Sequence, residues 1–249
     1  MNGIRVLERA LDVLAFMAKA GEPVRISDIA GVTNLSHATV YRILSTLRRH
    51  NVVLQGKNSL YMIGPAPLTW AGAYHARAAL TQAFRAEAME LWRMSRETVH
   101  LYSFERDRIY YVDKMDSPQN VIMRSHIGAW RDLYSTAGGR AVLSALPETE
   151  RTAYLESTPL VAHTDCTCID REALLRLLAD GKQRGYHADV GENEEGICCI
   201  GAPVLNASGY PIGAISVSAP AYRMNSAAME RIGWAVRSAA GKITQAMKA

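Results

Sequence analysis

The sequence has little cysteine and no long apolar run. Four of its 249 residues are cysteine, and they stand as two close pairs, Cys166 with Cys168 and Cys198 with Cys199. These spacings match neither a zinc knuckle nor a disulfide framework, so a reducing cytoplasm is the expected compartment. No apolar stretch approaches the roughly 20 residues that a membrane-spanning helix needs. The first residues also lack a basic segment followed by an apolar core, so neither a membrane span nor a secretion signal is expected.

Internal repeats and low-complexity segments are also missing, and nothing in the sequence predicts a cofactor. Positive charge, by contrast, is present in excess and is unevenly placed. The chain has 28 lysine and arginine residues against 24 aspartate and glutamate residues, a net charge of +4. Residues 1–64 hold eight of the basic and four of the acidic residues, so the whole excess lies there. A polyanion would bind this first quarter, although a charge of +4 is also compatible with a merely solubilising surface.

The first 64 residues have the element order of a winged helix-turn-helix. Residues 4–19 are predicted to form a well-buried helix, because both Leu7 with Leu11 and Val13 with Met17 fall on apolar stripes. Ser27 is predicted to cap a second helix over residues 28–33. After a turn, Ser36 is predicted to cap a third helix that ends near His50. Two β-like runs, 52–55 and 60–63, follow and predict a hairpin.

The third helix carries the chemistry of this domain. In a helix-turn-helix the first turns of the recognition helix, here the third helix of the domain, enter the major groove. Arginine can bind guanine through two hydrogen bonds, small apolar groups can touch the thymine methyl, and hydroxyls near a helix N-terminus suit phosphate. The predicted DNA-binding residues are Ser36, His37, Ala38, Thr39, Tyr41 and Arg42, with Lys57 at the tip of the wing. An ordinary three-helix bundle with a solvated polar face is the alternative. Charge, element order and the hairpin together favour DNA binding.

Residues 64–67, Gly-Pro-Ala-Pro, predict a break in the chain. We therefore expect a DNA-binding domain over 1–64, a linker helix over 65–80 and a larger α+β domain over 81–249. The expected elements are helices over 68–95, 137–145, 170–184 and 227–247, and strands over 98–104, 109–114, 121–127, 197–205 and 212–219. The linker offers a small-residue surface for close contact with a second copy, made of Leu68, Ala71, Gly72, Ala76 and Ala79.

Several motifs resemble the IclR family of bacterial transcriptional regulators. They are V-L-E-R-A-L-D-V-L near the start, S-H-A-T-V-Y-R-I-L-S-T-L in the third helix, L-Y-S-T-A-G-G-R-A-V-L-S-A-L, and R-G-Y-H-A-D-V-G-E-N-E-E-G-I-C-C-I-G-A-P-V. The resemblance covers nearly the whole chain. It implies a winged helix joined by a linker helix to a GAF-like effector domain, assembly as homodimers or dimers of dimers, and small organic, aromatic or sugar-derived acids as effectors.

Two late strands suggest where an effector binds. Period two places Cys199 and Gly201 on one face of the first strand, and Ser216 and Ser218 on one face of the second. A face of small, mildly polar groups leaves room for a ligand, but it equally suits a closely approaching helix. The helix expected at Ala137 offers free backbone N–H groups to an anion. With the positions implied by the resemblance, the predicted effector-binding residues are Ala137, Gly138, Asp189, Cys199, Gly201, Ser216 and Ser218.

Further residues complete the expected site. Arg124 and Arg131 flank it, and either can meet a carboxylate, although at least one is expected to form a surface ion pair. The acidic run Glu192, Glu194 and Glu195 is expected to be a solvated loop. Tyr134 or Trp130 can cover an aromatic or sugar-like ligand.

Other functions remain possible from the residues alone. A metal-responsive regulator would use His163, Asp165, Cys166 and Cys168. A cysteine-dependent enzyme would use Cys199 as nucleophile with His187 as base, but a thiol inside a strand is usually inert. An RNA-binding winged helix would need an aromatic stacking surface, which is missing. We therefore expect a regulator that is not an enzyme and binds no metal, and whose partners are operator DNA and a small acid.

Overall fold

A computed structural model describes residues 3–76, 79–121, 123 and 125–248. The chain divides into two compact units, Met1–Arg77 and Ala78–Ala249. Each unit has its own hydrophobic core. Within the described residues, no helix is both long enough and apolar enough to cross a membrane.

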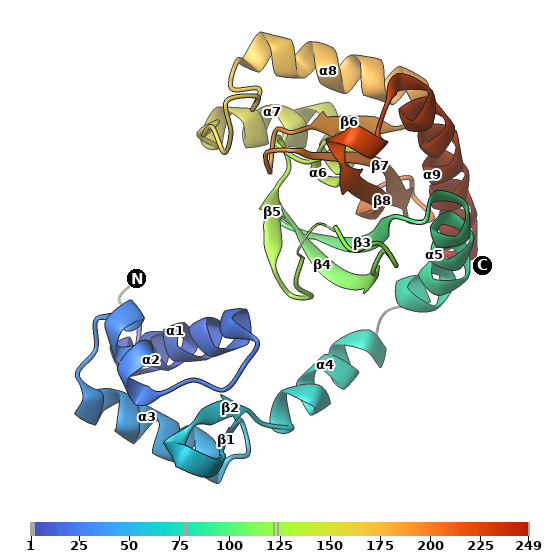
Figure 1. Cartoon of the computed structure of the whole chain (residues 1–249). Helices are drawn as coiled ribbons and strands as arrows, with labels where there is room; N and C mark the ends of the chain where they lie inside the picture. The colour runs from blue at the N-terminus through green and yellow to red at the C-terminus, as the bar shows by residue number, and fades with distance from the viewer. Residues whose placement is uncertain (1–2, 77–78, 122, 124, 249) are drawn as a thin grey trace. The chain divides into compact units, whose positions relative to one another are not determined.

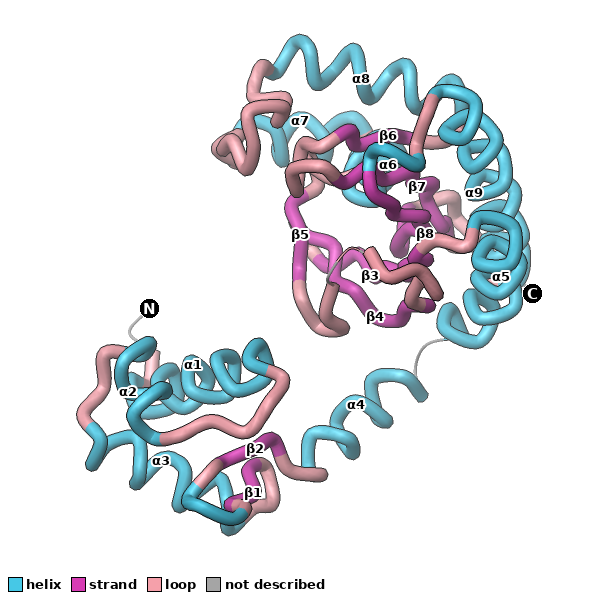
Figure 2. The backbone as a smooth tube through the Cα atoms, in the orientation of Figure 1, coloured by secondary structure: helices cyan, strands magenta, loops and turns pink. Residues whose placement is uncertain are grey.

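The first unit is a winged helix-turn-helix followed by a helix (Figures 1 and 2). Its elements are α1 (Arg5–Ala20), α2 (Ile26–Thr33), α3 (His37–Arg49), β1 (Val53–Gln55), the 3-10 turn η1 (Lys57–Ser59), β2 (Tyr61–Ile63) and α4 (Ala66–Ala76). The strands β1 and β2 pair antiparallel, with Leu54 opposite Met62. The helix predicted as a linker, α4, belongs to this unit.

Two details of the first unit differ from the sequence prediction. The second helix begins at Ile26, so Ser27 is not its cap; instead the Arg25 N–H donates to Asp28 Oδ2 at 2.9 Å. The prediction that α1 is well buried is also wrong. Val13 and Met17 enter the core, but Leu7 and Leu11 remain 55% and 58% exposed. One stripe of α1 is sufficient to pack on α2 and the hairpin, and the second stripe is left without a covering element in this unit.

The second unit is an α+β domain built on a six-stranded antiparallel sheet with the order β5-β4-β3-β8-β7-β6. The strands are β3 (Thr98–Glu105), β4 (Arg108–Met115), β5 (Trp130–Asp132), β6 (His187–Val190), β7 (Ile197–Leu205) and β8 (Pro211–Pro220). The helices are α5 (Ala79–Ser95), α6 (Ala137–Ala145), α7 (Glu148–Ser157), α8 (Arg171–Arg184), the short η2 (Ala221–Arg223) and α9 (Ser226–Ala246).

The two faces of this sheet are covered by different helices (Figure 1). Ile200 and Val217 point to the face on which α5 and α9 pack, and Leu91 and Val236 complete that core. Cys199 lies on the opposite face, where α6 packs directly on β7 and β8 and α8 packs on α6. The alternation of apolar and small residues along β7 and β8 therefore separates a dry layer from a more polar one.

One predicted strand is wrong. Over 121–127 the described residues form no strand, and the sheet gains β5 at Trp130–Asp132 instead. Side-chain bonds hold the 121–127 segment: Ser125 Oγ lies 2.8 Å from His100 Nε2, and Lys114 Nζ donates to the Ser125 carbonyl at 2.9 Å. The sequence prediction also missed the helix α7 and the edge strand β6.

Candidate DNA-binding surface and effector site

The start of α3 presents the predicted DNA-binding side chains to solvent. Val40, Ile43 and Leu44 are buried in the core of the unit, which turns the other face of the helix outward. His37, Ala38 and Arg42 are exposed, and Tyr41 is 56% exposed. The unit thus exposes an imidazole, a phenol and a cation on the first two turns of α3.

The cap of α3 is formed by the two hydroxyl residues. Ser36 Oγ accepts a hydrogen bond from the Thr39 backbone N–H at 3.3 Å and lies 2.9 Å from Thr39 Oγ1. This cap fixes the direction of the first turn, which is the part of the helix that reads a groove. The Arg48 guanidinium bonds Gln55 and ties α3 to β1. Lys57 is exposed in η1, the turn of the wing.

In the second unit, the sheet brings five of the predicted effector residues onto the side that faces α6. Asp189 on β6 is opposite Cys199 on β7, and Cys199 is opposite Ser218 on β8. In the neighbouring row, Gly201 is opposite Ser216. Residues that are paired directly across strands share a face. We call this side the polar face, and Ala137 and Gly138 at the start of α6 lie against it.

Three residues of the polar face were missed by the sequence prediction. Tyr102 OH lies 3.2 Å from Ser216 Oγ, and His100 Nδ1 lies 3.3 Å from Ser218 Oγ. The Tyr111 ring packs 4.7 Å from the Tyr102 ring and 4.9 Å from the His100 ring. The signal was present, since His100 and Tyr102 are two apart on one strand, which places them on one face.

Burial keeps most groups of the polar face uncharged near neutral pH. It lowers the pKa of His100 to about 3, and the cations Lys114 and Arg131 act in the same direction. It raises the pKa of Asp189 to about 7, against two backbone N–H donors, Glu192 and Asn193, which favour the ionised form. It also raises the pKa of the Cys199 thiol well above its ordinary value. The polar face therefore offers hydrogen bonds rather than fixed charge.

The start of α6 combines donors without partners and close packing. The Thr136 hydroxyl accepts from the Gly139 N–H at 3.0 Å, but within the described residues the Ala137 and Gly138 N–H groups have no hydrogen-bond partner. The buried hydroxyl of Ser135 also lacks one there. A Cβ on Gly201 would lie 2.8 Å from the Gly138 nitrogen. The missing side chain of Gly201 thus makes room for α6. This agrees with the alternative that the small residues of this face allow a helix to approach closely.

The flanking residues divide between the site and its surroundings. The Arg131 guanidinium lies 5.3 Å from the Tyr111 ring centroid, so a cation does border the polar face. Arg124 lies outside the described residues. Tyr134 is 1% exposed, and its hydroxyl donates to the Val161 carbonyl at 2.8 Å, which leaves it no role as a ligand cover. Trp130 is 43% exposed, with the Arg108 guanidinium 3.8 Å from its ring centroid.

The acidic loop after β6 is not uniformly solvated, which corrects the prediction. Glu194 and Glu195 are exposed, but Glu192 is only 9% exposed. Its carboxylate pairs with the buried Arg140 guanidinium, with one arm at 2.6 Å. The charge of Arg140 draws the loop inward and holds Asp189 in place.

The alternative sites find no support in the geometry. Within the part of the chain that the structure describes, no three His, Cys, Asp or Glu side chains are grouped to hold a metal. His163 instead contacts Tyr134 and Asp132. His187, the base of the enzyme alternative, hydrogen-bonds Ser144 at 2.8 Å.

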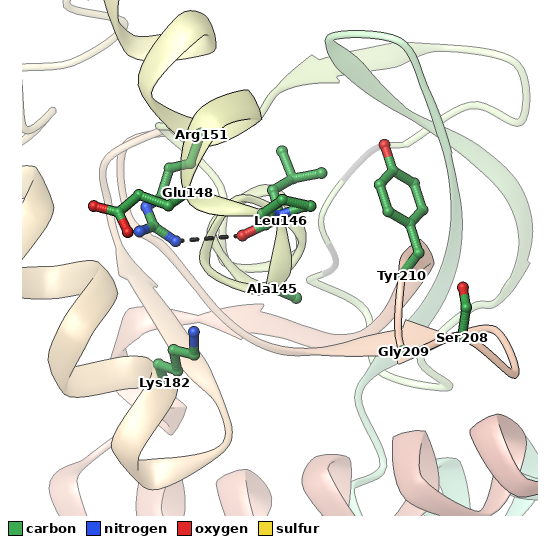
Figure 3. Close-up of a pocket in the computed structure, with 9 residues that line it drawn as sticks. Ala145, Leu146, Glu148, Arg151, Lys182, Ser208, Gly209 and Tyr210 are labelled. Carbon is green, nitrogen blue, oxygen red and sulfur yellow. Dashed lines mark hydrogen bonds between the residues drawn. The ribbon is translucent and has the colours of Figure 1, made fainter.

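A cavity of about 460 Å³ lies elsewhere in the second unit, at the far end of α6 (Figure 3). Arg151 and Lys182 border it together with the β7–β8 turn, and the Arg151 guanidinium donates to the Leu146 carbonyl at 3.3 Å. None of the predicted effector residues lines this cavity.

Comparisons with known proteins agree with this architecture. Residues 72–245 match the model of the bacterial transcriptional regulator IclR C-terminal domain, and residues 6–56 match the IclR helix-turn-helix domain. The transcriptional regulator KdgR of Escherichia coli is 31% identical over 240 residues, covering 95% of this chain and 91% of KdgR. The regulator XynR of the same organism is 30% identical, covering 90% and 89%.

Solved structures agree as well. The Thermotoga maritima IclR superimposes with a TM-score of 0.84 at 29% identity, covering 99% of this chain and 100% of that one. An IclR homologue from Microbacterium hydrocarbonoxydans, complexed with 4-hydroxybenzoate, has the same fold, with a TM-score of 0.80 at 23% identity and coverage of 97% and 98%. This chain belongs to the IclR family of bacterial transcriptional regulators, with a DNA-binding helix-turn-helix and a C-terminal effector domain.

Proposed function

We propose that α3 and the wing bind double-stranded operator DNA under the control of a small organic acid that binds the polar face. The observation that carries the proposal is the start of α6, where two backbone N–H groups and the buried Ser135 hydroxyl lack partners among the described residues. Native proteins rarely leave buried polar groups unpaired. The two N–H groups belong to the backbone that lies against Gly201, on a sheet face made of hydroxyls, aromatic rings and a carboxyl group.

A carboxylate suits the start of α6. Anions bind helix N-termini because the first N–H groups are free and the helix dipole is positive there. Ala137 and Gly138 supply these N–H groups, and the Tyr102 ring packs against Gly138, where a Cβ would lie 2.8 Å from it. The Arg131 guanidinium borders the same face and adds attraction at longer range.

Neutral hydrogen-bonding groups contact the other end of the ligand. Ser216 and Ser218 present hydroxyls on one face, next to Gly201 and Cys199 of β7. With a pKa of about 7, Asp189 can donate to a keto oxygen or accept from a hydroxyl. Its ionised form repels a second carboxylate, so hydroxy and keto acids are favoured over dicarboxylic acids.

An aromatic acid also suits this face. The rings of Tyr102 and Tyr111 form an aromatic wall next to Ser216. The related Microbacterium protein is complexed with 4-hydroxybenzoate, a small acid with a hydroxyl group, which supports the class proposed here.

Operator recognition needs more than one copy. One recognition helix contacts too few base pairs for genomic specificity, so two half-sites are read by a dimer. We therefore propose a homodimer or a dimer of dimers that acts on DNA and has no catalytic activity. The linker helix α4 offers exposed contact area through Leu68, which is 73% exposed.

Calorimetry with hydroxy, keto and aromatic acids, and with their uncharged amides, tests the effector site. The acids are expected to bind and the amides are not, because only the acids carry the charge that the start of α6 favours. The variant Ser216→Ala/Ser218→Ala is expected to lose affinity, while Ser157→Ala on α7, whose hydroxyl bonds its own helix, is not. Equal binding of acids and amides, or unchanged affinity in the double variant, contradicts the proposed carboxylate site.

A further inference from the structure

Two cavities lie at the far end of α6, and Lys182 borders both of them. The first, of about 460 Å³, also has Arg151 in its lining (Figure 3). The second, of about 350 Å³, shares Ala145 and Gly209 with the first and is lined by His187 as well. No predicted effector residue lines either cavity. Because α6 begins at the polar face, ends at Ala145 and spans about 12 Å, this end of the domain offers a ligand a separate place.

Neither of the two cations in the first cavity is neutralised by a carboxylate. Arg151 near the start of α7 and Lys182 in the last turn of α8 have no ion-pair partner among the described residues. The Arg151 guanidinium donates one hydrogen bond to the Leu146 carbonyl at 3.3 Å, which leaves its other N–H groups available. In Figure 3 the two side chains extend toward each other from α7 and α8. An anion between them would interact with both charges.

A buried imidazole borders the second cavity. His187 is 2% exposed, and burial lowers its pKa to about 3, so the ring is neutral near pH 7. The Ser144 hydroxyl donates to the Ala141 carbonyl at 3.0 Å and therefore accepts from His187 Nε2, which lies 2.8 Å away. Nδ1 is then the acceptor nitrogen of the ring, and no group in the described part of the chain donates to it. Since buried acceptors are rarely left unpaired, a ligand hydroxyl suits this position.

We propose that the two cavities bind a phosphate monoester with a small hydroxylated body, such as a polyol phosphate. The phosphate lies between Arg151 and Lys182, the body enters the second cavity, and one of its hydroxyls donates to His187 Nδ1. A phosphate monoester carries up to two negative charges and three acceptor oxygens near neutral pH. A guanidinium binds such oxygens in pairs and an ammonium adds a compact charge. The polar face has no comparable pair of cations, so the two sites bind different anions.

No single residue identifies this site. A lysine in the last turn of a helix also stabilises the helix dipole, and Arg151 also bonds the end of α6. The exposed Glu148 borders the first cavity and repels a phosphate. The inference therefore depends on the combination of two unneutralised cations, two adjoining cavities and a buried acceptor without a donor.

Calorimetry on the full chain tests the ligand class with three matched probes. Glycerol 3-phosphate is expected to bind, and glycerol, which lacks the phosphate, is not. Propyl phosphate has the same length and charge but no hydroxyl group. It is expected to bind about two- to tenfold more weakly than glycerol 3-phosphate, because it leaves His187 Nδ1 without a donor.

Charge variants locate the phosphate. Lys182→Gln, at an exposed position, is expected to weaken glycerol 3-phosphate about two- to tenfold, and Arg151→Gln/Lys182→Gln more than tenfold. Glu148→Gln is expected to strengthen it about two- to fivefold, because a repulsive charge is removed. Arg176→Gln is the matched control, since Arg176 lies on the same helix as Lys182 but lines neither cavity.

The double variant Ser216→Ala/Ser218→Ala separates this site from the polar face, and it is expected to bind glycerol 3-phosphate as the wild type does. Loss of binding in that variant places the phosphate at the polar face and overturns the inference. Unchanged affinity in Arg151→Gln/Lys182→Gln, or no binding of glycerol 3-phosphate to the wild type, also overturns it. Propyl phosphate that binds as tightly as glycerol 3-phosphate contradicts the contact with His187. None of these results depends on whether an acid binds the polar face.

Discussion

Arg140 in α6 and Glu192 in the loop after β6 form a two-armed ion pair in the interior of the effector domain. Arg140 is 1% exposed, and its guanidinium also donates to the carbonyl oxygens of Tyr134 at 2.7 Å and Ala188 at 3.1 Å. The Glu192 carboxylate accepts a further hydrogen bond from the Cys168 N–H at 3.0 Å. The pair thus joins three segments that surround the polar face.

Removing one member of this pair is expected to destabilise the protein strongly. Glu192→Gln leaves the Arg140 charge buried and uncompensated, which costs about 3–5 kcal/mol. Chemical denaturation measures the change in the free energy of unfolding. Arg176→Ala is the matched control, because Arg176 and its partner Glu172 are 70% and 87% exposed, and such pairs contribute about 0–1 kcal/mol. A loss below about 1 kcal/mol in Glu192→Gln shows that water reaches the pair.

The sequence predicts most elements because their periodicity and caps are local. Ser36 caps α3 and Asp170 caps α8 as single side chains acting on nearby N–H groups, and such signals need no knowledge of the fold. The burial of Glu192 is different, because it depends on Arg140, 52 residues away in the chain. No local pattern distinguishes that glutamate from its exposed neighbours.

In the candidate site too, local patterns predict some residues, while others depend on contacts between distant parts of the chain. Period two along β7 and β8 correctly placed Cys199, Ser216 and Ser218 on one face, because a strand alternates by geometry. His100 comes from β3, which lies beside β8, and Tyr111 from β4, which lies beside β3. This strand order is a matter of topology, so the late strands alone could not reveal these two residues. The exposure of Leu11 was missed for a related reason: an apolar stripe does not say whether its partner lies in the same chain.

Specific and general DNA contacts are expected to respond differently to mutation. Arg42→Ala should cost about 1–3 kcal/mol of operator binding if the guanidinium makes a bidentate contact with guanine. Lys57→Ala should weaken binding to all sequences alike and reduce the dependence of affinity on salt, because a phosphate contact releases counterions. Gel-shift titrations with operator and unrelated DNA at several salt concentrations measure both effects. Unchanged operator affinity in Arg42→Ala removes that residue from the interface.

The buried carboxyl group of Asp189 predicts a pH dependence of stability. Its pKa is about 7 in the folded protein and 3.8 ordinarily. Between these values the unfolded chain has released the proton that the folded protein keeps, so stability falls as the pH rises through this window and stays lowered above it. The expected loss is about 1.4 kcal/mol per pH unit within the window.

Asp189→Asn isolates this effect. The amide oxygen can still accept from the Glu192 N–H, as Asp189 Oδ1 does at 2.8 Å, and the amide does not titrate. Relative to the wild type, the variant should therefore gain stability from pH 4 to pH 7 and no more above it. His100 and His187, whose pKa values are lowered to about 3, lose stability as the pH falls below about 6.5, but both proteins share that loss. If the difference in the free energy of unfolding between the wild type and Asp189→Asn does not change with pH, the raised pKa of Asp189 is contradicted.

The contact between Gly201 and α6 predicts that even one methyl group is too large at this position. A Cβ on residue 201 would lie 2.8 Å from the Gly138 nitrogen and 2.9 Å from the Ala137 carbonyl carbon. Both are backbone atoms, so no side chain can turn away, and α6 itself has to move. Gly201→Ala is therefore expected to cost about 1–3 kcal/mol of stability and to weaken effector binding, because it displaces the N–H groups of Ala137 and Gly138.

Gly31→Ala in α2 is the matched control for this glycine. Nothing lies within 4 Å of a Cβ at Gly31, so alanine should stabilise the helix there by about 0.5–1 kcal/mol. Denaturation curves of both variants give the stabilities, and calorimetry with an acid that binds the wild type gives the affinity. If Gly201→Ala folds as stably as the wild type but binds the acid poorly, the space over Gly201 belongs to the ligand rather than to α6. A loss of both indicates that the helix which closes over the sheet is the same structure that presents the carboxylate site.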